Sequence, residues 1–224
     1  MTDLRILPAG DAALLVEMPS RIDPVTSDLV LALARGIRGR CGAAARDVVV
    51  GYCSVTIYFD PLVVDIAWLE SEVRAIHDAL PRDVAPPCTV HDVPVCYERE
   101  FAPDLDEVAA FGGLSAADVA LVHASVTYRV YVIGFMPGFA YMATVDPRLA
   151  LPRRASPRTH VPPGSVAIAA GQTAIYPIET PGGWHLIGRT NLKPFDPFRA
   201  EPFLFSPGDQ VRFRAVSRAE FERA

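Results

Sequence analysis

Apolar positions in the first 80 residues follow two periods, the two-residue period of strands and the three-to-four-residue period of helices. Residues 4–18 predict two short strands around a turn at Ala9-Gly10-Asp11, and the β-branched and aromatic runs at 48–50 and 54–59 predict further strands. Two other segments carry an apolar stripe and predict helices, one beginning at Asp23 and one at Asp65. The resulting order predicts a small α+β domain with its helices on one face of a sheet.

A proline-rich segment separates this part from the rest of the chain. Residues 81–87 hold three prolines directly after the second predicted helix, and prolines at this density cannot continue regular structure. We predict a domain boundary at residue 85, with a first domain over residues 1–85 and a second over residues 86–224.

The sequence pattern predicts that the second domain is mainly β. It opens with a predicted strand at 90–97, followed by two short helices that begin near Asp104 and Ser115. After Tyr128, short strand-like runs alternate with glycine and proline turns, at 129–134, 165–169, 173–176, 184–188 and 211–216. Many short strands separated by turns predict a sandwich or a barrel.

Composition narrows the class of protein. Half of the 224 residues are hydrophobic, which excludes disorder caused by low hydrophobicity, and the net charge of -5 argues against a nucleic-acid partner. No apolar run is long enough to span a bilayer, and the N-terminus shows no signal-peptide pattern, so we expect a cytoplasmic protein without membrane contact. The four cysteines form no C-x-x-C pair and are expected to be free thiols.

Common catalytic signatures are absent from the sequence. With Lys193 as the one lysine, no Walker loop can be present, and neither a G-x-G-x-x-G turn nor an H-E-x-x-H helix occurs. The five histidines show no metal-ligand spacing, so no metal site is predicted. These absences favour a component of a larger enzyme over one that works alone.

A glycine- and aromatic-rich segment at 134–141 is the first candidate for a site. Two glycines and a proline between aromatic residues give the backbone an unusual path, with Gly138 and Phe139 at its centre. The segment could form a backbone-lined pocket wall. The alternative is a structural turn under an aromatic cluster.

A local concentration of arginines is the second candidate. Between Pro147 and Ile178 there is no acidic residue, yet this stretch contains Arg148, Arg153, Arg154 and Arg158. Guanidinium groups suit carboxylate or phosphate, so an anion site is one interpretation. A solvated basic loop, or a contact with an acidic partner surface, is the other.

The third candidate is the segment at 179–190. Thr180–Gly183 is predicted to be a turn. If a strand follows, His185 and Arg189 share one face, where the histidine could act as acid or base and the arginine could hold an anion. The alternative is the solvent-exposed polar face of an antiparallel sheet.

Several motifs, taken in order, resemble one known family. They are Pro94-Val95-Cys96-Tyr97, Phe101–Leu105, His123, Gly134–Tyr141, Pro152–Arg158, Val161–Ala169, Gly171–Pro177, Pro181–Thr190, Phe195-Asp196-Pro197 and Pro207-Gly208-Asp209. The chain is similar to the B-subunit family of prokaryotic 5-oxoprolinase, also known as allophanate hydrolase subunit 1, which includes the sporulation kinase inhibitor KipI. The motifs span the whole second domain.

The resemblance implies an α+β N-terminal domain followed by a mainly-β, cyclophilin-like barrel domain. It implies two partners, the 5-oxoprolinase C-subunit, which has a related fold, and the A-subunit. The family's complex hydrolyses 5-oxo-L-proline to L-glutamate with ATP cleavage, so ATP and Mg²⁺ are the expected cofactors, bound by the assembled complex. The alternatives are a component that acts on allophanate or another urea derivative, and a non-enzymatic histidine-kinase inhibitor.

The candidate site residues fall into two groups. The candidates for catalysis are His185, Arg189 and His123. The candidates for binding substrate or nucleotide are Arg153, Arg154, Arg158, Gly138, Phe139 and Gln172.

Overall fold

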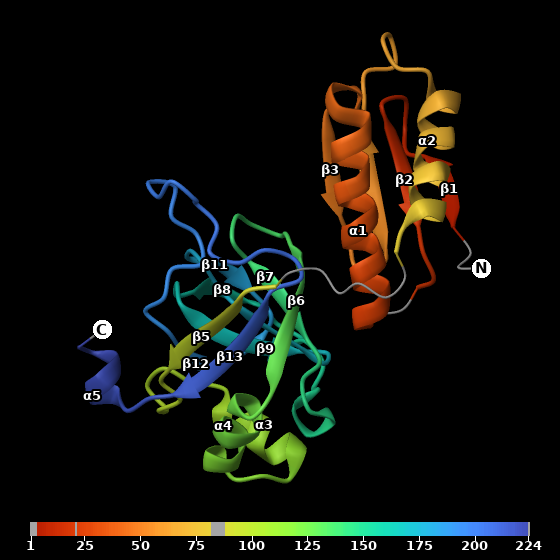
Figure 1. The fold of residues 1–224 in the computed structure, drawn as a ribbon. Coiled ribbons are helices and arrows are strands. Elements are labelled where there is room, and N and C mark those ends of the chain that lie inside the picture. The colour runs from red at the N-terminus through yellow and green to blue at the C-terminus, as the bar shows by residue number, and fades with distance from the viewer. Residues whose placement is uncertain (1–3, 21, 82–87, 224) are drawn as a thin grey trace. The chain divides into compact units, whose positions relative to one another are not determined.

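The computed structural model describes residues 4–20, 22–81 and 88–223, and the chain divides into two compact units, residues 1–87 and 88–224 (Figure 1). The boundary predicted at residue 85 lies outside the described residues. No helix in the described ranges is long and apolar enough to cross a membrane.

The first unit is a four-stranded antiparallel sheet with two helices. Its strands follow the order β1-β2-β4-β3, and α1 packs beside α2. Asp23 caps α1 by accepting a hydrogen bond from the Thr26 N–H, and Asp65 caps α2 in the same way, as the sequence predicts. The bounds are β1 Arg5–Pro8, β2 Ala13–Glu17, α1 Pro24–Cys41, η1 Gly42–Ala44, β3 Asp47–Val50, β4 Ser54–Tyr58 and α2 Ile66–Ala79.

The second unit is a mixed seven-stranded sheet with the order β12-β9-β10-β7-β6-β13-β5, and a separate two-stranded ribbon of β8 and β11. The bounds are β5 Val90–Val95, α3 Leu105–Gly112, α4 Ala116–Ala124, β6 Thr127–Ile133, β7 Ala140–Ala143, η2 Pro147–Leu149, β8 Arg158–Val161, β9 Ser165–Ala169, β10 Gln172–Ile175, β11 Thr180–Gly182, β12 His185–Arg189, β13 Gln210–Ala215 and α5 Arg218–Phe221.

The two end strands of this sheet meet and nearly close it into a barrel. Cys96, directly after β5, exchanges two backbone hydrogen bonds with Arg189 in β12, at 2.8 and 2.9 Å. The α+β unit followed by a barrel-like domain confirms the predicted fold class. The predicted turn at Thr180–Gly183 was wrong, because Thr180–Gly182 form β11 and pair with β8.

The barrel sheet buries apolar side chains on both faces. One face packs against α3 and α4, which lie together at one end of the unit (Figure 1), and its core includes Val166, Ile168 and Ile187. The other face forms a smaller cluster around Ala167, Phe139 and Trp184. Burying a large apolar side chain contributes about 1.5–3 kcal/mol, so both clusters stabilise the unit. All four cysteines are free thiols, as predicted.

Candidate functional site

An aromatic pocket of about 230 Å³ opens on the smaller apolar cluster of the second unit. Phe139 is its centre, with ring centroids 4.8–5.7 Å from four neighbouring aromatic rings. The pocket is lined by Phe135, Phe139, Tyr141, Arg153, Pro157, Tyr176, Pro181, Gly182, Gly183 and Trp184. Such walls suit a small flat ligand, because aromatic faces offer contact area without competing hydrogen bonds.

Among the described residues that line this pocket, Arg153 is the charged one. Its guanidinium carbon lies 5.8 Å from the centroid of the Trp184 ring, in a cation–π arrangement. Burial raises the pKa of the Tyr176 phenol, while a backbone hydrogen bond from Trp184 and the charge of Arg153 act in the opposite direction. The pocket therefore offers one fixed positive charge and protonated phenols, a combination that suits a ligand with a single carboxylate.

The backbone of the predicted segment at 134–141 forms one edge of the pocket. Gly138 has φ of +82°, and a Cβ added there would lie 2.6 Å from the Phe195 Cβ, so a glycine is required. Phe135 also has a positive φ, 66°, which is unusual for a bulky residue. This conformation places the Phe135 ring edge-on against Phe139. Phe139 lines the pocket. Gly138 does not line it, and its role is to allow the backbone conformation of this segment.

A buried charge cluster lies on the α3 side of the sheet. One carboxylate oxygen of Asp104 accepts hydrogen bonds from Arg154 at 2.9 Å and Arg158 at 2.5 Å, and the other accepts the backbone N–H of Leu186 at 2.6 Å. Arg154 also binds Glu107 at 3.1 Å. Two of the arginines predicted to bind an anion are therefore paired with carboxylates.

His185 belongs to this charge cluster and is almost fully buried. Its Nε2–H donates to the Pro152 carbonyl at 2.9 Å, and its Nδ1 lies 3.6 Å from a Glu107 carboxylate oxygen. Sequence reasoning missed Glu107 and took Asp104 only as the start of a helix. The signal that could have found them is their spacing of three at a predicted helix start, which places Asp104 at the N-cap of α3 and Glu107 above it in the first turn.

The prediction that His185 and Arg189 share a face of β12 was wrong. His185 lies opposite Ile168 and Arg189 opposite Ser165, with a register shift between Leu186 and Gly188. Ile168 and Ser165 are three residues apart on β9 and point to opposite faces, so their partners do too. The Arg189 Nε–H donates to the Pro163 carbonyl at 3.2 Å, away from the charge cluster.

His123 is fully buried in the barrel core. The Tyr97 hydroxyl donates to its Nδ1 at 2.8 Å, and its Nε2–H donates to the Thr173 hydroxyl at 2.9 Å, which in turn donates to the Ala167 carbonyl. Burial lowers the pKa of His123 from 6.5 to about 3. A neutral imidazole with both nitrogens paired and no solvent contact is arranged to hold the core together.

Gln172 begins β10, opposite Ala143 and Ala169 on the neighbouring strands. It is not among the residues that line the aromatic pocket. The structure thus brings Arg153 and Phe139 together in the pocket, and Arg154, Arg158 and His185 together in the charge cluster, while Arg189, His123 and Gln172 lie elsewhere.

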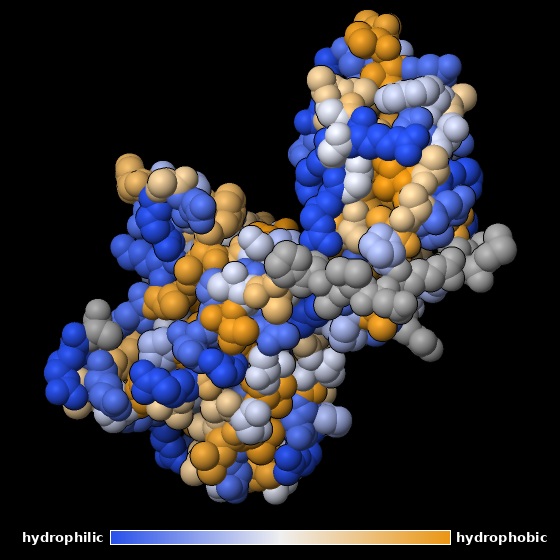
Figure 2. Space-filling model, viewed as in Figure 1, coloured by the Kyte–Doolittle hydropathy of each residue, from blue (hydrophilic) through white to orange (hydrophobic). Residues whose placement is uncertain are grey.

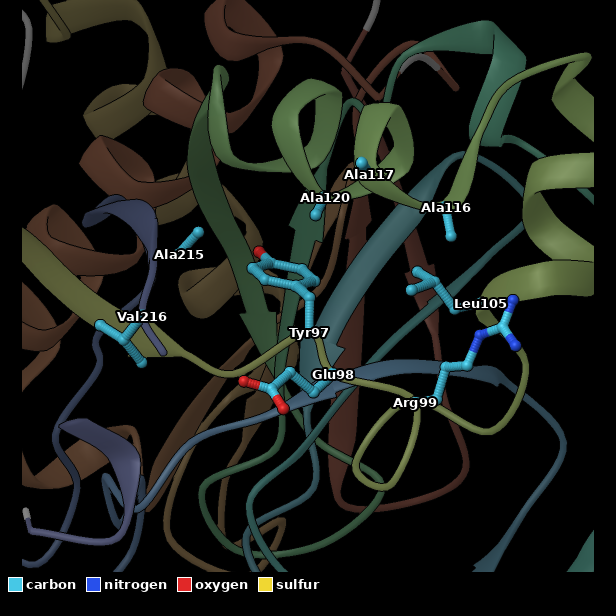
Figure 3. A pocket seen from close by; sticks show the side chains of 9 residues that line it. All are labelled: Tyr97, Glu98, Arg99, Leu105, Ala116, Ala117, Ala120, Ala215 and Val216. Carbon is cyan, nitrogen blue, oxygen red and sulfur yellow. The ribbon is translucent and has the colours of Figure 1, made fainter. Parts of the chain in front are cut away.

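A second hollow lies beside α3 and α4. Figure 3 shows the Tyr97 ring as its floor, under alanines of α4, with Glu98 and Arg99 near its edge. Both charged residues already have partners, since Glu98 accepts the Arg218 backbone N–H and Arg99 binds Asp106. Hydrophobic residues also lie between hydrophilic ones over these two helices (Figure 2). The hollow is mainly apolar, and its two charged residues are already paired, so we do not consider it a candidate catalytic site.

The comparisons with known proteins agree on one family. The family model described as carboxyltransferase domain, subdomain C and D, matches residues 4–205. The 5-oxoprolinase B-subunit of Bacillus subtilis (strain 168) is 34% identical over 223 residues, which cover 95% of this chain and 92% of that protein. The 5-oxoprolinase B-subunit of Haemophilus influenzae is 34% identical over 216 residues, covering 94% and 97%.

A solved structure supports the same conclusion. The crystal structure of TTHA0988 is 35% identical, with a TM-score of 0.80, over 92% of this chain. The match covers only 40% of the TTHA0988 chain, so that protein carries a long additional part. Family model, near-full-length relatives and fold all coincide, and the chain belongs to the 5-oxoprolinase B-subunit family.

Proposed function

We propose that this chain acts as the B-subunit of a multi-subunit, ATP-dependent 5-oxoprolinase, which hydrolyses 5-oxo-L-proline to L-glutamate, and that it is inactive without its partners. The observation that carries the proposal is the 34% identity to a 5-oxoprolinase B-subunit over 95% of this chain and 92% of the relative. The partners would be a C-subunit of related fold and an A-subunit, in the cytoplasm where ATP is available.

The chemistry of the reaction explains why several proteins are needed. A lactam is a poor electrophile, and transfer of a phosphoryl group to its carbonyl oxygen creates a good leaving group. That step needs cations around the transferred group. We assign ATP and Mg²⁺ to the assembled complex, because the sequence of this chain contains neither a Walker loop nor a G-x-G-x-x-G turn.

The aromatic pocket is our candidate for the substrate. The five-membered ring of 5-oxoproline is small and flat, and it would lie against the aromatic wall of the pocket that Phe139 and Trp184 form together. Its carboxylate would pair with Arg153 at the pocket edge. The support for this is the size of the pocket, its aromatic walls and its single guanidinium group.

Omission of each protein in turn tests the function. Glutamate and ADP are measured after mixing this chain with the candidate C- and A-subunits, 5-oxoproline, ATP and Mg²⁺. The proposal requires product with all three proteins and none when this chain is left out. Product formed equally well without this chain would rule it out.

A urea derivative is the second candidate substrate, favoured by a partial match to the urea amidolyase of Lachancea kluyveri, which is 32% identical over 54% of this chain and 7% of that protein. Allophanate and urea would be offered to the same assembled complex. Turnover of allophanate without turnover of 5-oxoproline would move the assignment to that substrate, and the reverse result would keep it on the lactam.

A further inference from the structure

Three buried nitrogen atoms in the charge cluster have no hydrogen-bond partner among the described residues. They are the Nε of Arg154, the Nη1 of Arg158 and the Nδ1 of His185. Unpaired buried polar atoms are costly, and in a folded protein each one calls for an explanation such as an ion. His185 strengthens the case, because its side chain is only 4% exposed and its Nδ1 faces Glu107 across 3.6 Å.

Glu107 is the outermost member of the cluster. Its side chain is 57% exposed, against 28% for Arg154 and 25% for Arg158. It lies in the first turn of α3 and is held by one hydrogen bond to Arg154, since its distance to His185 exceeds hydrogen-bonding length. An exposed ion pair of this kind contributes little stability, so this carboxylate can be displaced.

The charges of the cluster favour an anion once Glu107 has moved away. Two guanidinium groups then face the single carboxylate of Asp104, which leaves one positive charge. Asp104 itself already accepts three hydrogen bonds, from Arg154, Arg158 and the Leu186 backbone. We propose that Arg154, Arg158 and His185 form a binding site for a small, singly protonated oxyanion of the phosphate class, and that the Glu107 carboxylate occupies this site when it is empty. The guanidinium groups would donate to the anion's oxygens, and its remaining O–H would donate to the His185 Nδ1, which has no proton because the Nε2–H donates to Pro152.

A divalent cation is the competing occupant. Asp104, Glu107 and His185 each offer one ligand atom, and these three atoms lie within 4.8 Å of one another. The two guanidinium groups beside these carboxylates would repel such a cation. Both Asp104 oxygens are also already in use, one by the two arginines and the other by the Leu186 backbone N–H. The geometry therefore favours the anion.

Titration of the full chain with inorganic phosphate, followed by calorimetry, tests the site without any partner protein. Glu107→Gln removes the competing charge and should bind phosphate roughly fivefold more tightly than the unmodified chain. Asp106→Asn is the matched control, because Asp106 is also an exposed acid on α3 but pairs with Arg99. It should leave the affinity unchanged. Adding Arg154→Gln to the Glu107→Gln variant should abolish the gain.

The position of the bound anion is checked by NMR of the histidine nitrogens in the Glu107→Gln variant. Phosphate should shift the His185 Nδ1 signal and leave the buried His123 signals in place. Equal tightening in both acidic variants would reveal a general charge effect and overturn the proposal. Glu107-dependent binding of Mg²⁺ or Zn²⁺ in place of phosphate would overturn it as well.

This inference rests on the proposed function only for the source of the phosphate, which an ATP-cleaving complex would supply. The two can fail separately. If the chain does not bind phosphate, the omission assay with 5-oxoproline still tests the proposed function. If the assembled complex does not act on 5-oxoproline, the phosphate titration still tests the anion site.

Discussion

Trp184 and His185 are adjacent in the sequence, yet their side chains belong to two different sites of the second unit. The Trp184 indole packs against Phe139 and Tyr141 in the aromatic pocket. The His185 imidazole is buried in the charge cluster, where it donates to the Pro152 carbonyl and faces Glu107. One peptide bond thus links the candidate substrate pocket to the proposed anion site.

Arg153→Gln tests the aromatic pocket. Removing the guanidinium should raise the KM for 5-oxoproline roughly tenfold in the assembled complex, because a charge-assisted hydrogen bond is lost, and should change kcat much less. Steady-state kinetics measures both. Arg148→Gln is the control, since Arg148 pairs with Asp146 and does not line the pocket. The same rise in KM from both substitutions would contradict the assignment.

Asp104→Asn should destabilise the protein by about 3 kcal/mol, because it removes one partner of a buried ion pair and leaves two guanidinium groups without their shared carboxylate. Urea unfolding at pH 7 measures the effect. Asp106→Asn, at an exposed position, should cost less than about 0.5 kcal/mol. If the two variants unfold at the same urea concentration, the ion pairs of Asp104 do not stabilise the protein as predicted.

Gly138→Ala should cost about 1–3 kcal/mol, because the positive φ disfavours a side chain and the new Cβ would meet Phe195. Gly134→Ala is a close control in the same segment. A Cβ at Gly134 meets nothing within 4 Å, so this variant should unfold within about 0.5 kcal/mol of the unmodified chain. Thermal or urea unfolding separates the two. If Gly138→Ala leaves the free energy of unfolding unchanged, the backbone conformation at this position does not require glycine.

His123 should make the stability depend on pH. Its pKa is lowered by burial to about 3, so the unfolded chain binds a proton below pH 6.5 that the folded chain rejects. The stability that the neutral His123 contributes is therefore fully present above pH 6.5 and is lost as the pH falls toward 3. Between pH 7 and pH 5, the unmodified chain should lose about 2 kcal/mol more than a His123→Gln variant, measured by urea unfolding at each pH. Parallel losses in the two proteins would contradict a buried neutral imidazole.

The sequence was a good guide to elements with strong local signals. Both helices of the first unit begin at aspartates that cap them, and the β-branched and aromatic runs at β3 and β4 form strands. Strands β7 and β8 were not predicted. Ala140–Ala143 and Arg158–Val161 are rich in small or polar residues, and they become strands only through pairing with neighbours that are distant in the sequence.

The arrangement of the site could be predicted only in part. The segments at 134–141, 152–158 and 179–190 do supply the pocket and the charge cluster. The bulge in β12 turns the Arg189 side chain to the face opposite the predicted one. This bulge arises from the pairing of β12 with β9, which is not visible in the local sequence. Gly188 was a usable hint, since an isolated glycine in a strand often marks a bulge or a close approach, and here a Cβ would meet Val95 and the Cys96 carbonyl.

The parallel pairing of β5 with β13 determines when the second unit can finish folding. Asp92 and Arg212 lie side by side in this pair and form an ion pair, although 120 residues separate them in the sequence. On the ribosome, the strand at Val90–Val95 emerges long before its partner is synthesised. Such distant pairing slows folding, and an unpaired edge invites aggregation. The nascent barrel therefore depends on the last strand of its sheet, and we expect a cell to protect the chain until residues 210–215 have paired with β5.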